Sequence, residues 1–160
     1  MNVILLALAF CLGMALSVQA AVNTQLAQSL GANSSLAALV SFACGTLVLL
    51  VVALVKSGPG ALGATLVALP SQPLWKFAGG FLGAAFVFGM VFLAPRIGLL
   101  SLVVLVIAGQ LLSSMMIDQF GLINMAARKV SGVRVFGALV MVSGVAITLF
   151  GDRIVASLSR

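Results

Sequence analysis

The sequence predicts an all-α, polytopic integral membrane protein with about five transmembrane helices, forming a single transmembrane domain over residues 1–160. Hydrophobic residues make up 63% of the chain and charged residues only 6%, whereas a soluble domain carries about 25% charged residues. The chain also contains five apolar stretches close to the length of about 20 residues that crosses a bilayer core. In lipid every backbone polar group needs an internal partner, so we expect these stretches to be helices.

The first predicted span needs to be distinguished from a cleaved signal peptide, because Val18, Gln19 and Ala20 could form a cleavage site. No Lys or Arg precedes its apolar run, although signal peptides begin with a positively charged region. We therefore expect this segment to stay in the protein as a helix. The five predicted spans are 3–22, 36–55, 74–94, 97–117 and 133–150.

The connections differ in character. The segment 23–35 is uncharged and rich in amides, and the first helix can continue into it. In 56–73, glycines and prolines are expected to break the helix, and the apolar piece 61–69 can lie in the membrane interface. Trp75 then suits an interfacial anchor. The expected helix breakers are Gly58, Pro59, Gly60, Pro70 and Pro73.

The next connections are shorter or basic. Pro95 and Arg96 leave almost no loop, which predicts a tight antiparallel hairpin between spans three and four. Segment 121–132 carries Arg128 and Lys129. The net charge is +6, but the basic residues are scattered beside apolar runs, which is typical of topology determinants and not of a nucleic-acid surface. We therefore expect no nucleic-acid partner.

Charge sidedness is nearly balanced. With five crossings, five basic residues fall on the amino-terminal side and three on the other. Such a weak bias allows insertion in both orientations, and two copies could then form an antiparallel homodimer. The first group is Lys56, Lys76, Arg128, Lys129 and Arg134; the second is Arg96, Arg153 and Arg160.

Small residues recur at spacings that suit close helix packing. Gly79 and Gly83 share a face of the third span, and Gly137, Gly144 and Gly151 follow one another at intervals of seven. Close backbone approach is one of the forces that associate helices in lipid. These glycines could pack helices within one subunit, or the third or fifth helix could form a dimer seam.

Polar residues at membrane depth are candidates for function. In the fourth span, Gln110, Ser114 and Asp118 recur every four residues and share a face. Asp118 lies at a helix C-terminus, where the macrodipole disfavours an anion. It could form an interfacial salt bridge to Arg128 or Lys129, or it could bind a coupling proton or cation.

Gln19 and Asn23 are four residues apart in the first span. They are candidate substrate-binding residues together with Gln110 and Ser114, although interhelical hydrogen bonds to Gln110 would also explain them. Arg96 could be a topology determinant, or it could gate access or attract an anionic solute.

Enzyme chemistry is not expected. The chain has no His, Glu or Tyr, which removes most acid–base and metal-binding groups. Cys11 and Cys44 lie in apolar runs without a basic neighbour, so they suit inert thiols. We expect no catalytic residue, no metal and no cofactor.

Three pairs of segments resemble the YdcZ-type five-helix family of the drug/metabolite transporter (DMT, EamA-like) superfamily. The most specific is the third, in which Gly109-Gln110 is followed by Asp118 and then Phe120-Gly121. The resemblance extends over nearly the whole chain. The segments are 19–23 leading to 41–45, 79–83 leading to 95–98, and 107–113 leading to 118–121.

The resemblance implies a multi-pass protein of the bacterial inner membrane, related to exporters of drugs and metabolites. Members of the family occur as homodimers, as paired genes and as fused ten-helix proteins whose halves have opposite orientation. The similar small multidrug transporters depend on a Glu in their first helix. This chain has no Glu, so their coupling mechanism does not carry over.

Together, these features predict a transporter subunit that moves a small solute, in the direction of export, by alternating access as an antiparallel homodimer. Proton coupling through Asp118 is part of this hypothesis. The expected partners are the lipid bilayer, the solute, and a second copy or an inverted paired subunit. A non-transporting assembly or regulatory subunit and a passive channel stay open as alternatives.

Overall fold

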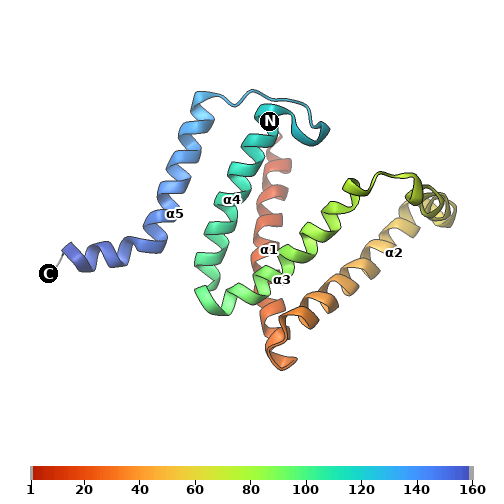
Figure 1. The fold of residues 1–160 in the computed structure, drawn as a ribbon, viewed down its shortest axis with the longest axis horizontal. Helices are drawn as coiled ribbons and strands as arrows, with labels where there is room; N and C mark the ends of the chain where they lie inside the picture. Colours follow the sequence, from red (N-terminus) through yellow and green to blue (C-terminus); the bar gives the residue numbers. More distant parts are fainter. Residues whose placement is uncertain (1, 159–160) are drawn as a thin grey trace. The chain divides into compact units, whose positions relative to one another are not determined.

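The computed structural model describes residues 2–158, and this part of the chain is helical with no strand. Five of its helices are long and apolar enough to cross a membrane, which confirms the predicted fold class. They are α1 (Val3–Ser29), α2 (Ser34–Ala68), α3 (Ala78–Ile97), α4 (Leu99–Phe120) and α5 (Gly132–Leu158) (Figure 1). Short 3-10 helices occupy Leu69–Ser71 (η1), Leu74–Phe77 (η2) and Leu122–Asn124 (η3).

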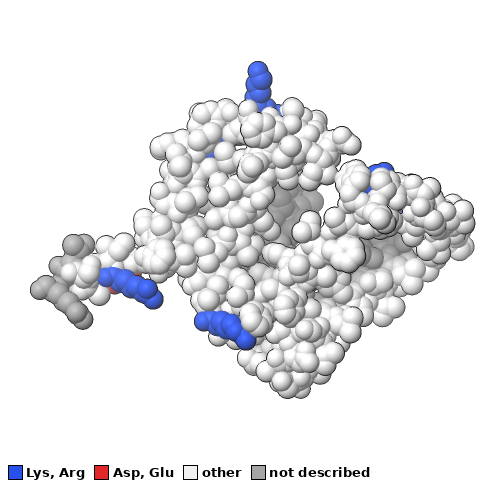
Figure 2. All heavy atoms as spheres, in the orientation of Figure 1, with Lys and Arg blue, Asp and Glu red and all other residues white. Residues whose placement is uncertain are grey.

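The chain divides into two compact units, Met1–Arg96 and Ile97–Arg160. The first contains α1, α2 and almost all of α3, and the second contains α4 and α5. Figure 2 shows wide surfaces without acidic or basic residues, as lipid contact requires, with the Lys and Arg side chains in a few separate places. A single transmembrane domain stays a prediction. Arg160, counted above for sidedness, lies outside the described residues.

Helix α1 continues well past its predicted end, through the amide-rich stretch to Ser29. The connection to α2 is therefore only four residues long, Leu30 to Asn33. Gly31 turns the chain in the left-handed region at φ 69°. The Asn33 side chain then caps α2 by accepting a hydrogen bond from the Leu36 N–H at 3.0 Å. The polar residues of this stretch consequently lie on a rigid helix and not in a loop.

Helix α2 is broken at the predicted position. Gly58 has φ 75° and ψ 165°, a backbone region that is essentially restricted to glycine, and Pro59 follows it. The helix resumes as a shorter piece that ends at Ala68, before η1 and η2. The break predicted at Gly58 and Pro59 is confirmed, whereas Gly60, also expected to break the helix, lies in the resumed helical piece. The interfacial position of the apolar piece 61–69 stays a prediction.

The core of the first unit is small and built from side chains of α1, α2 and α3. Its buried members are Ala27, Ala37, Ala38, Val87 and Val91, and Val91 is only 1% exposed. Gly83 lies against Phe42, whose Cζ would be 3.5 Å from a Cβ added at the glycine. Small residues thus let the three helices approach closely, as expected for helices in lipid.

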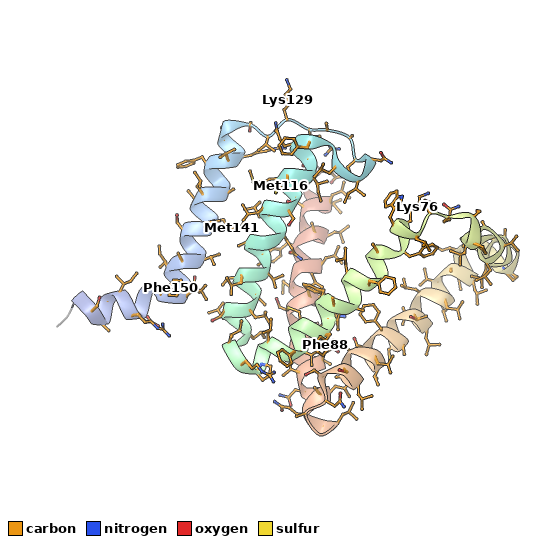
Figure 3. The ribbon with its side chains drawn as sticks, viewed as in Figure 1. Lys76, Phe88, Met116, Lys129, Met141 and Phe150 are labelled. Carbon is orange, nitrogen blue, oxygen red and sulfur yellow. The ribbon has the colours of Figure 1, made fainter. Side chains whose placement is uncertain are left out.

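In the second unit, α4 begins directly after Gly98, so a single residue separates it from α3. The connection is short, as predicted, but it lies at Gly98, because Pro95 and Arg96, which were expected to form it, lie inside α3. The antiparallel pairing of these spans stays a prediction. Gly121 ends α4 in the left-handed region at φ 60°. The following loop folds back, because the Arg128 N–H donates to the Asp118 carbonyl oxygen at 2.7 Å. Helix α5 changes direction close to Phe150 (Figure 3), next to Gly151.

Candidate functional site

A pocket of about 360 Å³ lies in the first unit, at the carboxyl ends of α1 and α3. Thr24 and Gln28 come from the helical extension of α1, Ser34 opens α2, and Arg96 lies in the last turn of α3. Small-molecule sites occupy about 300–1,000 Å³, so this pocket can hold a small solute. Its complete lining is Thr24, Ala27, Gln28, Ala32, Ser34, Val91, Pro95 and Arg96.

The Arg96 side chain is held by its own helix. Its Nη1 donates a hydrogen bond to the Phe92 carbonyl oxygen, and its guanidinium carbon lies 3.6 Å from the centroid of the Phe92 ring. Phe92 in turn stacks on Phe88, with ring centroids 5.8 Å apart. Cation–π contact and the negative end of α3 both favour a positive charge here.

The predicted pair Gln19 and Asn23 lies elsewhere in this unit. Both line a narrow gap against Phe86, Val87 and Met90 of α3, with a volume of about 10 Å³. That is room for about one water molecule. Asn23 is 6% exposed, and its Nδ2 donates to Ser41 Oγ on α2 at 3.1 Å. Within the first unit, the hydrogen-bond partner of Asn23 is thus Ser41 of α2, and a hydrogen bond to Gln110 of the second unit stays a prediction.

A second pocket, of about 280 Å³, lies between α4 and α5 in the second unit. It brings together Ser114 and Asp118 of the predicted polar stripe, one helical turn apart on α4. Ser114 Oγ donates to the Leu111 carbonyl oxygen at 2.9 Å. Arg134 adds a positive charge from α5. The complete lining is Leu111, Ser114, Met115, Asp118, Val130, Arg134, Gly137, Ala138 and Met141.

Asp118 has no basic nitrogen within 4.0 Å among the residues that the structure describes. The expected alternative of a salt bridge to Arg128 or Lys129 is therefore not formed. Arg128 contacts Asp118 only through the two backbones, and the Lys129 side chain points away from the loop (Figure 3). The half-buried Asp118 carboxylate instead shares a pocket with Arg134.

Sequence reasoning did not select Arg134 as a site residue, although its pattern was readable. Arg134, Gly137, Ala138 and Met141 follow one another at the spacing of one helical face, and the same four residues line the pocket. Arg134 was counted only as a charge that flanks a span. The spacing places Arg134 on the face of α5 that carries Gly137, but it does not show that this face meets α4.

Gln110, the remaining member of the predicted stripe, lies on α4 but does not line this pocket. Its side chain is exposed and forms no hydrogen bond within residues 2–158. An added Cβ would meet no atom within 4 Å at Gly79, Gly137 or Gly144, and at Gly151 it would lie 3.5 Å from Ile147 of the same helix. Space is therefore open at Gly79 and Gly144, whereas Gly83 lies against Phe42 and Gly137 lines the pocket between α4 and α5.

The described part of the chain offers few groups for metal binding or thiol chemistry. It contains no group of three or more His, Cys, Asp or Glu side chains that could hold a metal ion. Cys11 and Cys44 are exposed free thiols on separate helices.

Comparison with known protein families gives a match over residues 4–147 to a family described as "Putative inner membrane exporter, YdcZ". No curated protein and no solved structure matches the chain. The family match extends over most of the sequence, including the polar stripe of α4, and the five membrane-spanning helices agree with it. The chain therefore belongs to the YdcZ family and is a multi-pass protein of the inner membrane.

Proposed function

We propose that the protein exports a small solute across the inner membrane by alternating access, and that Asp118 couples export to proton movement. Membership of a family described as exporters favours a transporter over an enzyme. The observation that carries the coupling hypothesis is the position of Asp118 in the pocket between α4 and α5, without a salt bridge among the described residues.

Asp118 is one of only two acidic residues in the chain, and the other, Asp152, lies near the end of α5. An ionisable side chain within a membrane segment is costly, and such residues mark ion and proton pathways. A carboxylate that is locked in a salt bridge cannot readily change its charge. Asp118 forms no such bond among the described residues, and it lines a pocket of about 280 Å³.

Polar but uncharged side chains would orient the solute. We assign this role to Gln19, Asn23, Gln110 and Ser114, since amides and hydroxyls bind polar groups without the cost of burying a charge. Gln19 and Gln110 are exposed. Asn23 uses its Nδ2 for Ser41, which leaves its carbonyl oxygen available as an acceptor.

The working unit in this proposal is an antiparallel homodimer. Two inverted copies generate the inverted repeat on which alternating access is built in many transporters. The weak bias of five basic residues against three favours a cytoplasmic amino terminus only slightly and allows insertion in both orientations. Gly144 of α5, where an added Cβ would meet no neighbouring atom within 4 Å, offers a position for close packing of a second copy.

The coupling hypothesis is tested with purified protein in liposomes that contain a pH-sensitive dye. A panel of small solutes is added, and proton movement is followed together with solute flux. Wild-type protein should move protons with at least one solute, and Asp118→Asn should abolish this coupled flux while leaving the helix content intact. Asp152→Asn is the matched control and should behave as wild type.

Normal proton-coupled transport by Asp118→Asn would contradict the role of Asp118. The same assay separates the other function classes. Flux that does not saturate and ignores an imposed proton gradient indicates a passive channel. Absence of flux with every solute favours a non-transporting assembly or regulatory subunit.

The orientation of the chain is tested by placing a single cysteine after Ser159, with Cys11 and Cys44 removed, and labelling it in intact cells. Labelling of about half of the molecules would establish insertion in both orientations. Labelling of all or none would fix one orientation and direct the search to an inverted partner chain.

A further inference from the structure

We propose that the pocket of about 360 Å³ at the carboxyl ends of α1 and α3 binds the oxyanion group, carboxylate or phosphate, of a small solute. This proposal gives the chemical class of the exported solute, and it rests on the proposed export function for the statement that the bound solute is also transported. Binding itself can be measured without any flux. Three features favour an oxyanion ligand: the positive charge of the first unit, the unused hydrogen-bond donors in the pocket, and the contacts that hold Arg96.

The first unit has no acidic residue, because Asp118 and Asp152 are the only two in the chain. Its three basic residues are Lys56, Lys76 and Arg96. Arg96 is the one that lines the pocket, and no carboxylate in this unit can neutralise it. A solute with an oxyanion would supply the missing charge, and no acidic side chain of the unit would repel it.

The pocket also presents donors that the protein does not use. Only Nη1 of Arg96 is bonded, to the Phe92 carbonyl oxygen, so most of the five N–H groups of the guanidinium are free. The Gln28 and Ser34 side chains form no hydrogen bond within residues 2–158. A guanidinium fork matches the two oxygens of a carboxylate or phosphate, and such charge-assisted bonds are the strong ones.

Arg96 is also pre-positioned. The Phe92 ring lies 3.6 Å from its guanidinium carbon, and the Phe92 carbonyl oxygen accepts from its Nη1. Both contacts come from the preceding turn of α3 and restrict the side chain before any ligand arrives. Ala27 and Val91 form an apolar wall of the same pocket, so the ligand should combine an acidic head with a small apolar body.

Two simpler roles make different predictions. If Arg96 only stabilises the negative end of α3, the pocket should not distinguish an acid from its neutral amide. If Arg96 holds the phosphate of a lipid headgroup, an anionic lipid should occupy the site and displace soluble acids. The shared chemistry is an oxyanion on a guanidinium, so the experiment has to vary solute charge and lipid charge separately.

The full-length protein is reconstituted in phosphatidylcholine nanodiscs, and binding is measured by titration calorimetry. Three acid–amide pairs of rising size serve as probes: acetate and acetamide, benzoate and benzamide, 2-naphthoate and 2-naphthamide. Phenyl phosphate tests the phosphate form. At least one acid should bind about tenfold or more tightly than its amide, as expected when a charge-assisted bond is lost.

Arg96→Gln should remove this preference for the acid, and Lys76→Gln should keep it. Lys76 is a suitable control because it also loses one positive charge of the first unit, lies outside the pocket, and bonds Gln72 Oε1 through its Nζ at 2.9 Å. If Arg96→Gln does not fold, Arg96→Lys replaces it and should weaken the preference, because Lys lacks the planar fork. The acid–amide comparison on wild type needs no variant.

Equal binding of every acid and its amide, or no binding of any acid, would overturn the inference, as would full acid preference in Arg96→Gln. Loss of acid binding in nanodiscs that contain phosphatidylglycerol, with lipid retention that depends on Arg96, would assign the site to a headgroup and reject the solute. Acid binding without coupled flux would leave this inference standing and contradict the proposed export.

Discussion

Asn23 on α1 and Ser41 on α2 are joined by a hydrogen bond of 3.1 Å from Nδ2 to Oγ. Asn23 is also the only buried polar residue among those described. In a membrane, where apolar side chains do not drive helices together, such a bond contributes directly to helix association. The structure thus gives Asn23 a packing role in addition to the proposed contact with solute.

We expect Asn23→Ala and Ser41→Ala each to lower the stability of the protein in micelles. A double-mutant cycle should give a coupling energy of about 0.6 kcal/mol, up to about 1.7 kcal/mol. The measurement is reversible denaturation in mixed micelles. Ser17→Ala is the control, because the Ser17 hydroxyl contacts only the Gly13 carbonyl oxygen of its own helix. A coupling energy of zero would show that the bond does not hold α1 to α2.

Gln110→Leu should alter solute affinity by about threefold to tenfold, the value of one ordinary hydrogen bond. The Gln110 amide is exposed at membrane depth and has no hydrogen-bond partner in the described chain. A free amide is unfavourable in lipid, so we expect the solute or a second subunit to satisfy it. The solute profile of Met116→Leu, an exposed neighbour on α4, provides the comparison. An unchanged profile in Gln110→Leu would make Gln110 structural.

Gly144→Leu should weaken the dimer and spare the fold. A Cβ added at Gly144 meets no atom within 4 Å, so a monomer can accommodate a larger residue. At a seam the same side chain would separate the two backbones, and the dissociation constant should rise by about tenfold or more. Dimer content is measured by single-molecule photobleaching in nanodiscs.

Gly83→Leu is the comparison for Gly144→Leu, because it should lower the stability of the subunit itself. The Phe42 ring already lies 3.5 Å from the added Cβ position, so overpacking should reduce stability by about 1–3 kcal/mol. If Gly144→Leu leaves the dimer intact, Gly144 does not lie at the seam, and the open position Gly79 of α3 becomes the next candidate.

Gly58→Ala should destabilise the protein by about 1–3 kcal/mol, because φ 75° with ψ 165° is essentially closed to other residues. Gly60→Ala, two residues later, should be neutral or should stabilise by about 0.5–1 kcal/mol, since Gly60 has no positive φ, lies in a helical stretch and has open space around it. Thermal unfolding of the two variants in the same detergent tests this. Equal midpoints would mean that the kink is not a fixed feature of α2.

The number of spans, their approximate positions and the break in α2 could all be predicted from the sequence. Apolar length fixes the spans because lipid permits few alternatives, and a Gly-Pro pair rarely continues a helix. The positions of the helix ends were harder to predict. The first span was predicted to end at 22, with a possible continuation into 23–35, and the helix does continue to Ser29, because nothing in Asn23, Thr24 and Gln28 prevents helix formation.

The candidate site was only partly predictable. The interval of four residues correctly placed Ser114 and Asp118 on one face, because a single helix determines that relationship. Contacts between helices were beyond such reasoning. Neither the pairing of Asn23 with Ser41 nor the shared pocket of Asp118 and Arg134 follows from any spacing within one span. These contacts depend on how neighbouring helices rotate and cross.

The continuation of α1 to Ser29 has a thermodynamic consequence for recognition. Thr24 and Gln28 project into the pocket of Arg96 from a helix whose backbone is already fixed. A ligand that binds there does not have to immobilise a flexible loop, which would cost about 1–2 kcal/mol for each residue ordered. Even a few hydrogen bonds can then retain a small molecule. Selectivity among small molecules should depend on shape and charge, with little contribution from folding on binding.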